Sequence, residues 1–146
     1  MIADIIFTPL KIIPTPGGSV QHAMKKSDEG FSGYGEAYFS VCETGVVKAW
    51  KLHKEMTLNL IVPVGSIRFV VFDPCESFES QGTFNEFVLS PSNYGRLTIP
   101  PKLWMGFQGL SNGGNILLNI ANLEHDPDEV ERKPLDQIEF DWSIKR

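Results

Sequence analysis

Cysteine and histidine are scarce in this chain of 146 residues, which contains two cysteines and three histidines. Cys42 and Cys75 are too few and too far apart to predict a zinc ribbon or a secreted disulfide framework, so we expect reduced thiols in the cytoplasm. The N-terminal stretch also lacks a basic region and a long apolar run, because Pro9, Lys11 and Pro14 interrupt it. This pattern predicts an edge strand instead of a signal peptide or a membrane span.

An excess of positive charge is absent as well. The formal net charge is -5 and the sequence pI is about 5.1, which argues against nucleic acid or an anionic membrane as the main partner. Hydrophobic residues make up 42% of the chain and charged residues 21%, as is typical of an ordinary soluble globular protein. A local cationic pocket remains compatible with this overall charge.

Helical periodicity is almost absent, and short apolar runs rich in β-branched and aromatic residues take its place. Turns containing Gly, Pro, Asn or Ser separate the runs, which predicts an antiparallel sandwich or barrel, and specifically a jelly-roll-like β-barrel. The one plausible helical turn is "DPDEVERKPLDQ", and the alternating "IEFDWSIKR" predicts a further edge strand. The runs are "EAYFSVC", "GVVKAW", "TLNLIVPV", "IRFVVFD", "NEFVLS", "RLTIP", "GFQGLS" and "NILLNIANL".

A cluster of cationic side chains interrupts this pattern in "GVVKAWKLHKEMTLNLIVPVG", residues 45 to 65. Lys51 and His53 are two residues apart, so they point to the same face of a strand, and Lys48 lies close by. Four interpretations are open: metal ligands, catalytic groups, an anion-binding cluster, or solvated surface charges.

The order of motifs over residues 35 to 142 resembles the dTDP-4-dehydrorhamnose 3,5-epimerase family, a branch of the cupins, in a short and divergent form. The matching stretches are "GEAYFS", "GVVKAWKLHK", "VGSIRFVVFD", "FNEFVLSPSNYGRLTIPPKLWMGFQGLS", "LLNIAN" and "HDPDEVERKPLDQIEFDW". The resemblance implies one all-β cupin jelly-roll domain over residues 1–146. Its expected parts are N-terminal strands in 1–34, a barrel core in 35–122 and a C-terminal segment in 123–146.

The resemblance also implies a homodimer whose barrel mouth takes a nucleotide-linked 4-keto-6-deoxy sugar, with no cofactor. A base removes the proton next to the ketone, an enolate forms, and an acid returns a proton. The family's catalytic His position is Lys51 here, and His53 lies two places later, where many short members carry His. Asn59 falls near the position of an enolate-stabilising Lys, Gln108 replaces a Tyr acid, and Asp136 best matches the Asp that orients the base. The predicted catalytic residues are therefore Lys51, His53 and Asp136.

A metal site is disfavoured, because the metal-binding cupins use a His-x-His pair, a Glu and a later His. Here the pair is Lys51-x-His53, and Met105 stands where the last His would be. Binding of a diphosphate by several cations fits the sequence better. Each side chain taken singly also has a structural interpretation as a solvated or core residue. The predicted substrate-binding residues are Lys48, Glu36, Asn59, Arg68, Tyr94 and Gln108.

Three functions remain in competition. The first is a metal-free nucleotide-sugar epimerase or isomerase of deoxysugar and surface polysaccharide biosynthesis. The second is a catalytically degenerate cupin that only binds a sugar nucleotide, which the replacements at Lys51, Asn59 and Gln108 would explain. The third is a metal-dependent cupin enzyme, which the broken ligand set disfavours.

Overall fold

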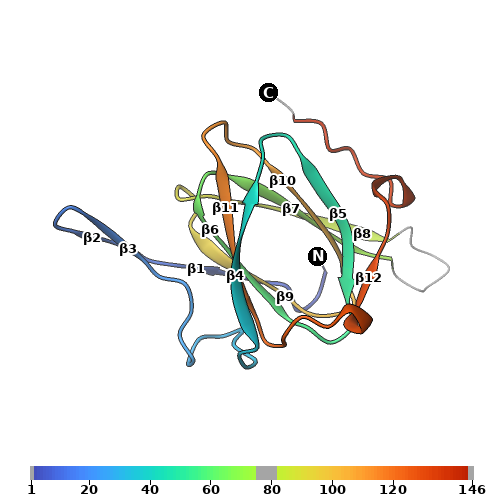
Figure 1. Ribbon diagram of the computed structural model, residues 1–146, viewed down its shortest axis with the longest axis horizontal. Helices are drawn as coiled ribbons and strands as arrows, with labels where there is room; N and C mark the ends of the chain where they lie inside the picture. The colour runs from blue at the N-terminus through green and yellow to red at the C-terminus, as the bar shows by residue number, and fades with distance from the viewer. Residues whose placement is uncertain (1, 75–81, 145–146) are drawn as a thin grey trace.

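Two five-stranded antiparallel sheets face each other and enclose the core of the protein (Figure 1). The computed structural model describes residues 2–74 and 82–144, so Cys75 lies outside the described residues. The first sheet has the order β1-β9-β6-β11-β4, and the second has the order β12-β5-β10-β7-β8. The first contains β1 (Ile6–Pro9), β9 (Gly95–Ile99), β6 (Leu58–Val64), β11 (Asn115–Ala121) and β4 (Glu36–Cys42). The second contains β12 (Val130–Arg132), β5 (Val47–His53), β10 (Trp104–Gly109), β7 (Ile67–Asp73) and β8 (Thr83–Leu89).

The predicted all-β cupin jelly roll is confirmed, and each of the eight predicted apolar runs contains or overlaps one strand. Two short 3₁₀ turns, η1 (Pro127–Glu129) and η2 (Leu135–Gln137), occupy the predicted helical turn. The prediction of an edge strand at the C-terminus is wrong, since residues 138–144 form no strand. No helix in residues 2–74 and 82–144 is long and apolar enough to cross a membrane.

The barrel interior is filled by alternate residues of the facing strands, as expected for sheets that bury one face. From β7 it takes Ile67, Phe69 and Val71, and from β11 it takes Leu117 and Ala121, all of them buried. The intervening residues of these strands point to the outer faces. This alternation tells us which polar side chains enter the barrel.

The outer face of the second sheet is covered by the C-terminal segment. Phe140 and Trp142 pack there against Trp50 and Phe84, and the Trp50 and Trp142 ring centroids are 5.5 Å apart. Aromatic packing against the face of the sheet therefore replaces the strand pairing that the alternating sequence predicted.

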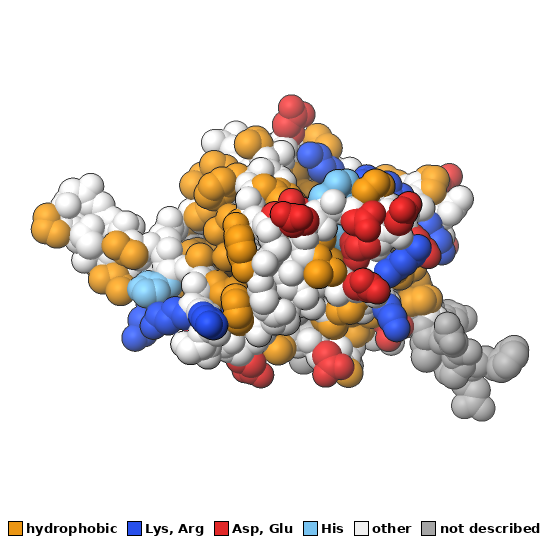
Figure 2. Space-filling view, turned by 60° about the horizontal axis from the view of Figure 1, so that its bottom comes forward, with side chains coloured by type: hydrophobic (Ala, Val, Ile, Leu, Met, Phe, Trp, Pro, Cys, Tyr) orange, Lys and Arg blue, Asp and Glu red, His pale blue; other side chains and the backbone are white. Residues whose placement is uncertain are grey.

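The outer face of the first sheet is partly covered by the segment before β4. The fully buried guanidinium of Arg96 donates to the carboxylate of Asp28 at 3.2 Å and to the carbonyl of Ala23 at 2.7 Å. The hairpin formed by β2 (Ile12–Thr15) and β3 (Gly18–Gln21) extends away from the barrel (Figure 1). Figure 2 shows hydrophobic side chains on this projecting arm, a His and basic side chains at its base, and a group of acidic and basic side chains on the other side of the molecule.

Candidate active site

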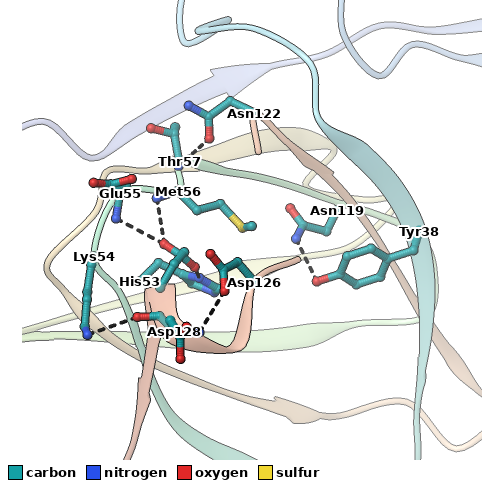
Figure 3. A network of polar contacts seen from close by, with 11 residues as sticks. Tyr38, His53, Lys54, Glu55, Met56, Thr57, Asn119, Asn122, Asp126 and Asp128 are labelled. Atoms are coloured by element: carbon teal, nitrogen blue, oxygen red, sulfur yellow. Dashed lines mark hydrogen bonds and ion pairs between the residues drawn. The ribbon is translucent and has the colours of Figure 1, made fainter. Parts of the chain in front are cut away.

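A histidine and a buried carboxylate meet inside the barrel. His53 is the last residue of β5, and Glu129 ends η1 directly before Val130, the residue that pairs with His53 in β12. The Nδ1 atom of His53 contacts Oε1 of Glu129. The other carboxylate oxygen, Oε2, accepts hydrogen bonds from the backbone amides of Glu55 at 3.1 Å and Met56 at 3.0 Å (Figure 3).

These contacts keep the Glu129 carboxylate ionised. Its burial acts to raise the pKa, but the hydrogen bond from His53 and those from the Glu55 and Met56 amides outweigh burial and hold the pKa below its ordinary value. An ionised Glu129 that accepts from Nδ1 fixes the ring orientation and the tautomer of His53. The Nε2 atom is then the nitrogen that can take a proton, so this arrangement can act as a general base.

Local backbone structure turns the Glu129 side chain inward. Asp126 caps η1 by accepting from the amide of Asp128 at 2.9 Å, and Pro127 supplies the fixed φ that suits a first helical position. The backbone amide of Lys54 bonds the Glu129 carbonyl at 2.8 Å, which ties the end of the turn to β5.

Sequence analysis did not identify Glu129, because it assigned "DPDEVERKPLDQ" only as a helical turn. A capped turn is present, and within it Glu129 is only 8% exposed. No motif marks this residue. The one signal in the sequence is its place directly before a short strand, and only the pairing of β12 with β5 brings that place next to His53.

A cationic cavity of about 550 Å³ lies along β5, the strand that ends at His53. Lys51 lies opposite Met105 and Arg132 in the sheet register, and Lys48 lies opposite Phe107. Met105 and Phe107 pack against the barrel core, so Lys48 and Lys51 share their inner face. The cavity is lined by Lys48, Ala49, Trp50, Lys51, Met105, Phe107, Arg132, Lys133 and Pro134.

The electrostatics of this cavity suit an anion. Burial lowers the pKa of the Lys51 ammonium, and the charges of Arg132 and Lys48 lower it further. An anionic ligand would relieve this repulsion and would accept charge-assisted hydrogen bonds from several donors. Lys51 and His53 are two strand residues apart, about 7 Å along β5, so the anion-binding side chains and the base lie on one continuous surface.

The structure thus brings together Lys48, Lys51 and His53 from the sequence-predicted set. Glu36 lies at the start of β4, on the side that parity assigns to Cys42 and the barrel interior. Tyr94 lies outside the sheets, where its hydroxyl donates to the carbonyl of His22 at 2.7 Å.

Three other predicted binding residues turn away from the barrel interior. Asn59 contacts Gly30 and Thr98 under the segment before β4. Arg68 donates to Gln108 Oε1 and to the carbonyl of Trp142, both at 2.6 Å, so Arg68 and Gln108 anchor the C-terminal segment on the outer face. All three residues alternate with core residues along their strands, and the sequence alone did not show which face of the sheet each of them occupies.

Asp136 was predicted to orient the base, but the carboxylate that contacts His53 is that of Glu129. Asp136 is exposed in η2. The neighbouring Leu135 carbonyl accepts from the indole of Trp50, whose side chain packs in the outer aromatic cluster. The register of the C-terminal segment, which no strand pairing fixes, explains the difference.

A second polar pair lies on the opposite sheet. Asn119 of β11 is 3% exposed, and its Nδ2 donates to the Tyr38 hydroxyl of β4 at 3.0 Å.

For metal binding, no group of three or more His, Cys, Asp or Glu side chains in the described part of the chain is arranged to hold an ion. That the protein binds no metal ion therefore stays a prediction.

Comparison with known proteins supports the relationship that the motifs indicated. The chain is 34% identical over 115 residues to the probable low-salt glycan biosynthesis epimerase Agl13 of Haloferax volcanii, and the alignment covers 75% of this chain and 73% of that protein. It is 35% identical to a dTDP sugar isomerase from Desulfovibrio desulfuricans G20, with a TM-score of 0.90 over 97% of this chain and 92% of the other.

A more distant structure shares the fold. The dTDP-4-dehydrorhamnose 3,5-epimerase of Sulfolobus tokodaii superposes with a TM-score of 0.81 at 24% identity, covering 97% of this chain and 83% of the other. No family model matches the sequence.

The jelly roll of two facing sheets makes this protein a cupin, and its relatives are sugar epimerases and isomerases. The chain belongs to the family of dTDP-4-dehydrorhamnose 3,5-epimerases and related dTDP-sugar isomerases.

Proposed function

We propose that this protein is an isomerase or epimerase that acts on a nucleotide-linked 4-keto-6-deoxy sugar, in the biosynthesis of a glycan or surface polysaccharide. The observation that carries the proposal is the His53–Glu129 pair, which leaves one imidazole nitrogen available as a base on the same strand face as the cationic cavity. Family membership supports the substrate class, since the relatives include a dTDP sugar isomerase and a glycan biosynthesis epimerase.

The proposed reaction begins with binding of the diphosphate in the cavity by Lys48, Lys51 and Arg132. His53 Nε2 then removes the proton from a carbon next to the ketone, and Glu129 stabilises the imidazolium that results. The electron pair of the broken C–H bond forms a double bond to the carbonyl carbon, and the carbonyl oxygen becomes the enolate oxygen. In a keto shift, the His53 imidazolium returns the proton to the former carbonyl carbon, while the neighbouring hydroxyl passes its proton to the enolate oxygen and becomes the new ketone. In an epimerisation, a water molecule protonates the opposite face of the same carbon, and the hydroxide that remains takes the proton of the imidazolium. None of these steps uses a metal ion.

A binding protein without turnover is the second candidate. Lys51 at the family's base position favours it, whereas the His53–Glu129 pair favours an enzyme. Incubation with a dTDP-linked 4-keto-6-deoxyhexose in deuterated water separates the two. Deuterium at the carbons next to the ketone would support the isomerase, and tight binding without any exchange would establish the binding protein.

We also propose a homodimer. The β2–β3 arm exposes Ile13 and Val20 although it makes no sheet pairing beyond its own hairpin in the described chain. On the outer face of β4, Phe39 is 68% exposed and Val41 is 67% exposed. Large apolar side chains gathered on a projecting arm and on an edge strand are typical of an interface. A cytoplasmic location completes the proposal, and the low cysteine content supports it.

A further inference from the structure

Asn119 carries a buried carbonyl oxygen without a partner inside the barrel. Its Oδ1 atom has no hydrogen-bond partner in residues 2–74 and 82–144, although the residue is only 3% exposed. The neighbours Leu117 and Ala121 belong to the barrel core, so alternation along β11 places the Asn119 side chain on the interior face. An unsatisfied buried acceptor is uncommon in folded proteins, and it calls for an explanation.

The contact with Tyr38 leaves this hydrogen-bonding capacity free. Asn119 Nδ2 donates to the Tyr38 oxygen at 3.0 Å, so the Tyr38 O–H hydrogen remains available to donate elsewhere. If the amide is turned over, Tyr38 donates to Oδ1 instead, and Nδ2 becomes the uncommitted group. Either orientation leaves a spare group on Asn119.

This pair faces the candidate base. Tyr38 and Asn119 belong to one sheet and His53 to the other, and Figure 3 shows the Tyr38 ring extending from β4 toward the side occupied by His53. Tyr38 is 45% exposed, so its side chain is not enclosed by the core. A sugar ring held next to His53 would present its hydroxyl and keto oxygens to the opposite sheet.

We propose that Tyr38 and Asn119 bind the sugar ring of the substrate and position it against His53. Asn119 Oδ1 accepts a hydrogen bond from a hydroxyl next to the keto carbon, and the Tyr38 O–H donates to an oxygen of the same ring. The pair thereby selects which carbon of the sugar lies next to His53. This inference rests on the proposed function, because it assigns the sugar-binding half of the same site.

Two variants test the role of the pair. Tyr38→Phe keeps the ring and removes the hydroxyl, and Asn119→Leu removes all hydrogen-bonding groups from a position flanked by apolar side chains. Tyr34→Phe is the matched control, since Tyr34 is 67% exposed. Calorimetric titration measures the affinity for dTDP and for a dTDP-linked 4-keto-6-deoxyhexose separately, and thermal unfolding checks the fold.

We expect each variant to bind the keto-sugar nucleotide about tenfold more weakly than the parent, as loss of one hydrogen bond predicts, while dTDP binding changes less than twofold. The double variant should lose less than the product of the two single effects, because the residues are bonded to each other. In the deuterium-exchange assay, the variants should raise KM, and Tyr34→Phe should behave as the parent.

Equal losses of dTDP and keto-sugar affinity would show a merely structural role and would overturn the inference, and so would variants that bind the keto sugar as the parent does. If Asn119→Leu does not fold, the Tyr38→Phe result decides alone. If the parent exchanges deuterium and the variants bind the keto sugar as the parent does, only this inference is disproved. A parent that neither exchanges deuterium nor binds the keto sugar disproves the proposed function, and this inference with it.

Discussion

The imidazole of His53 and the carboxylate of Glu129 are 76 positions apart in the chain, yet they are in direct contact inside the barrel. The carboxylate is held from its other side by the two backbone amides of Glu55 and Met56. A buried carboxylate with this many donors is ionised and immobile, which is what a histidine base requires of its partner.

The first prediction concerns this carboxylate. Glu129→Gln removes the charge that orients His53 and stabilises its imidazolium, so we expect the rate of proton exchange on the keto sugar to fall by about 10²-fold or more. Glu131→Gln is the control, because Glu131 is exposed on the same short strand. Equal exchange rates for Glu129→Gln and the parent would show that the contact is structural only.

Acid should destabilise the protein through the same residue. The pKa of Glu129 is lowered in the folded state, so its contribution to stability is complete above its ordinary pKa of 4.5 and is lost as the pH falls through the lowered value. Chemical denaturation from pH 7 to pH 3 should therefore show a steeper loss of the free energy of unfolding for the parent than for Glu129→Gln. Parallel curves for the two proteins would contradict this assignment.

Lys51 should act in opposite directions on stability and binding. Its pKa is lowered in the fold, so the charged form is disfavoured there, and this cost disappears only as the pH rises through the lowered value toward 10.5. At pH 7, Lys51→Met should raise the Tm of the free protein. It should also weaken dTDP binding by roughly 10- to 100-fold, as loss of a charge-assisted hydrogen bond predicts.

A second substitution at this position asks whether the family's usual base can be restored. Lys51→His should retain the fold and raise the rate of proton exchange, because a second imidazole would then face the sugar ring. An exchange rate equal to that of the parent would contradict this prediction.

The control for the charge lost in Lys51→Met is Lys54→Met, because Lys54 is exposed and donates to the Asp128 carbonyl outside the cavity. Unchanged dTDP affinity in Lys51→Met would show that Lys51 does not bind the nucleotide.

The assembly prediction rests on the projecting arm. Ile13→Lys together with Val20→Lys should convert a dimer into a monomer, because two charges would enter an apolar interface. Light scattering at micromolar concentration measures the mass. These two substitutions are more specific than a deletion of residues 1 to 13 would be, because the deletion would also remove the pairing of β1 with β9. A monomeric parent protein, or a dimer that survives both changes, would contradict the proposal.

The fold was predictable because its strands carry their pattern locally. Alternating or continuous apolar runs between Gly- and Pro-rich turns identified β4 to β11, and the spacing of Lys51 and His53 placed them on one face of a strand. Which face this is follows only from the pairing of β5 with β10. The C-terminal segment was harder, since alternation in "IEFDWSIKR" fits both a strand and an extended aromatic cover, and only packing against Trp50 decides.

The site was predictable only in part. Lys48, Lys51 and His53 are near neighbours in sequence, so one strand brings them together. Glu129 and Asn119 reach the barrel through pairings between distant strands, and their neighbours in sequence carry no signal for chemistry. Gln108 and Arg68 were expected at the mouth, but their strand parity turns them outward to hold the C-terminal segment.

The most direct test is the deuterium-exchange assay on the parent protein and His53→Asn, with a dTDP-linked 4-keto-6-deoxyhexose as substrate. Asparagine retains a polar group but cannot take the proton, and binding of dTDP to the Lys48, Lys51 and Arg132 side chains should persist. We predict deuterium next to the ketone with the parent and a loss of at least about 10²-fold with His53→Asn. Exchange at the parent rate in His53→Asn, or no exchange by the parent, would contradict the assignment of His53 as the base.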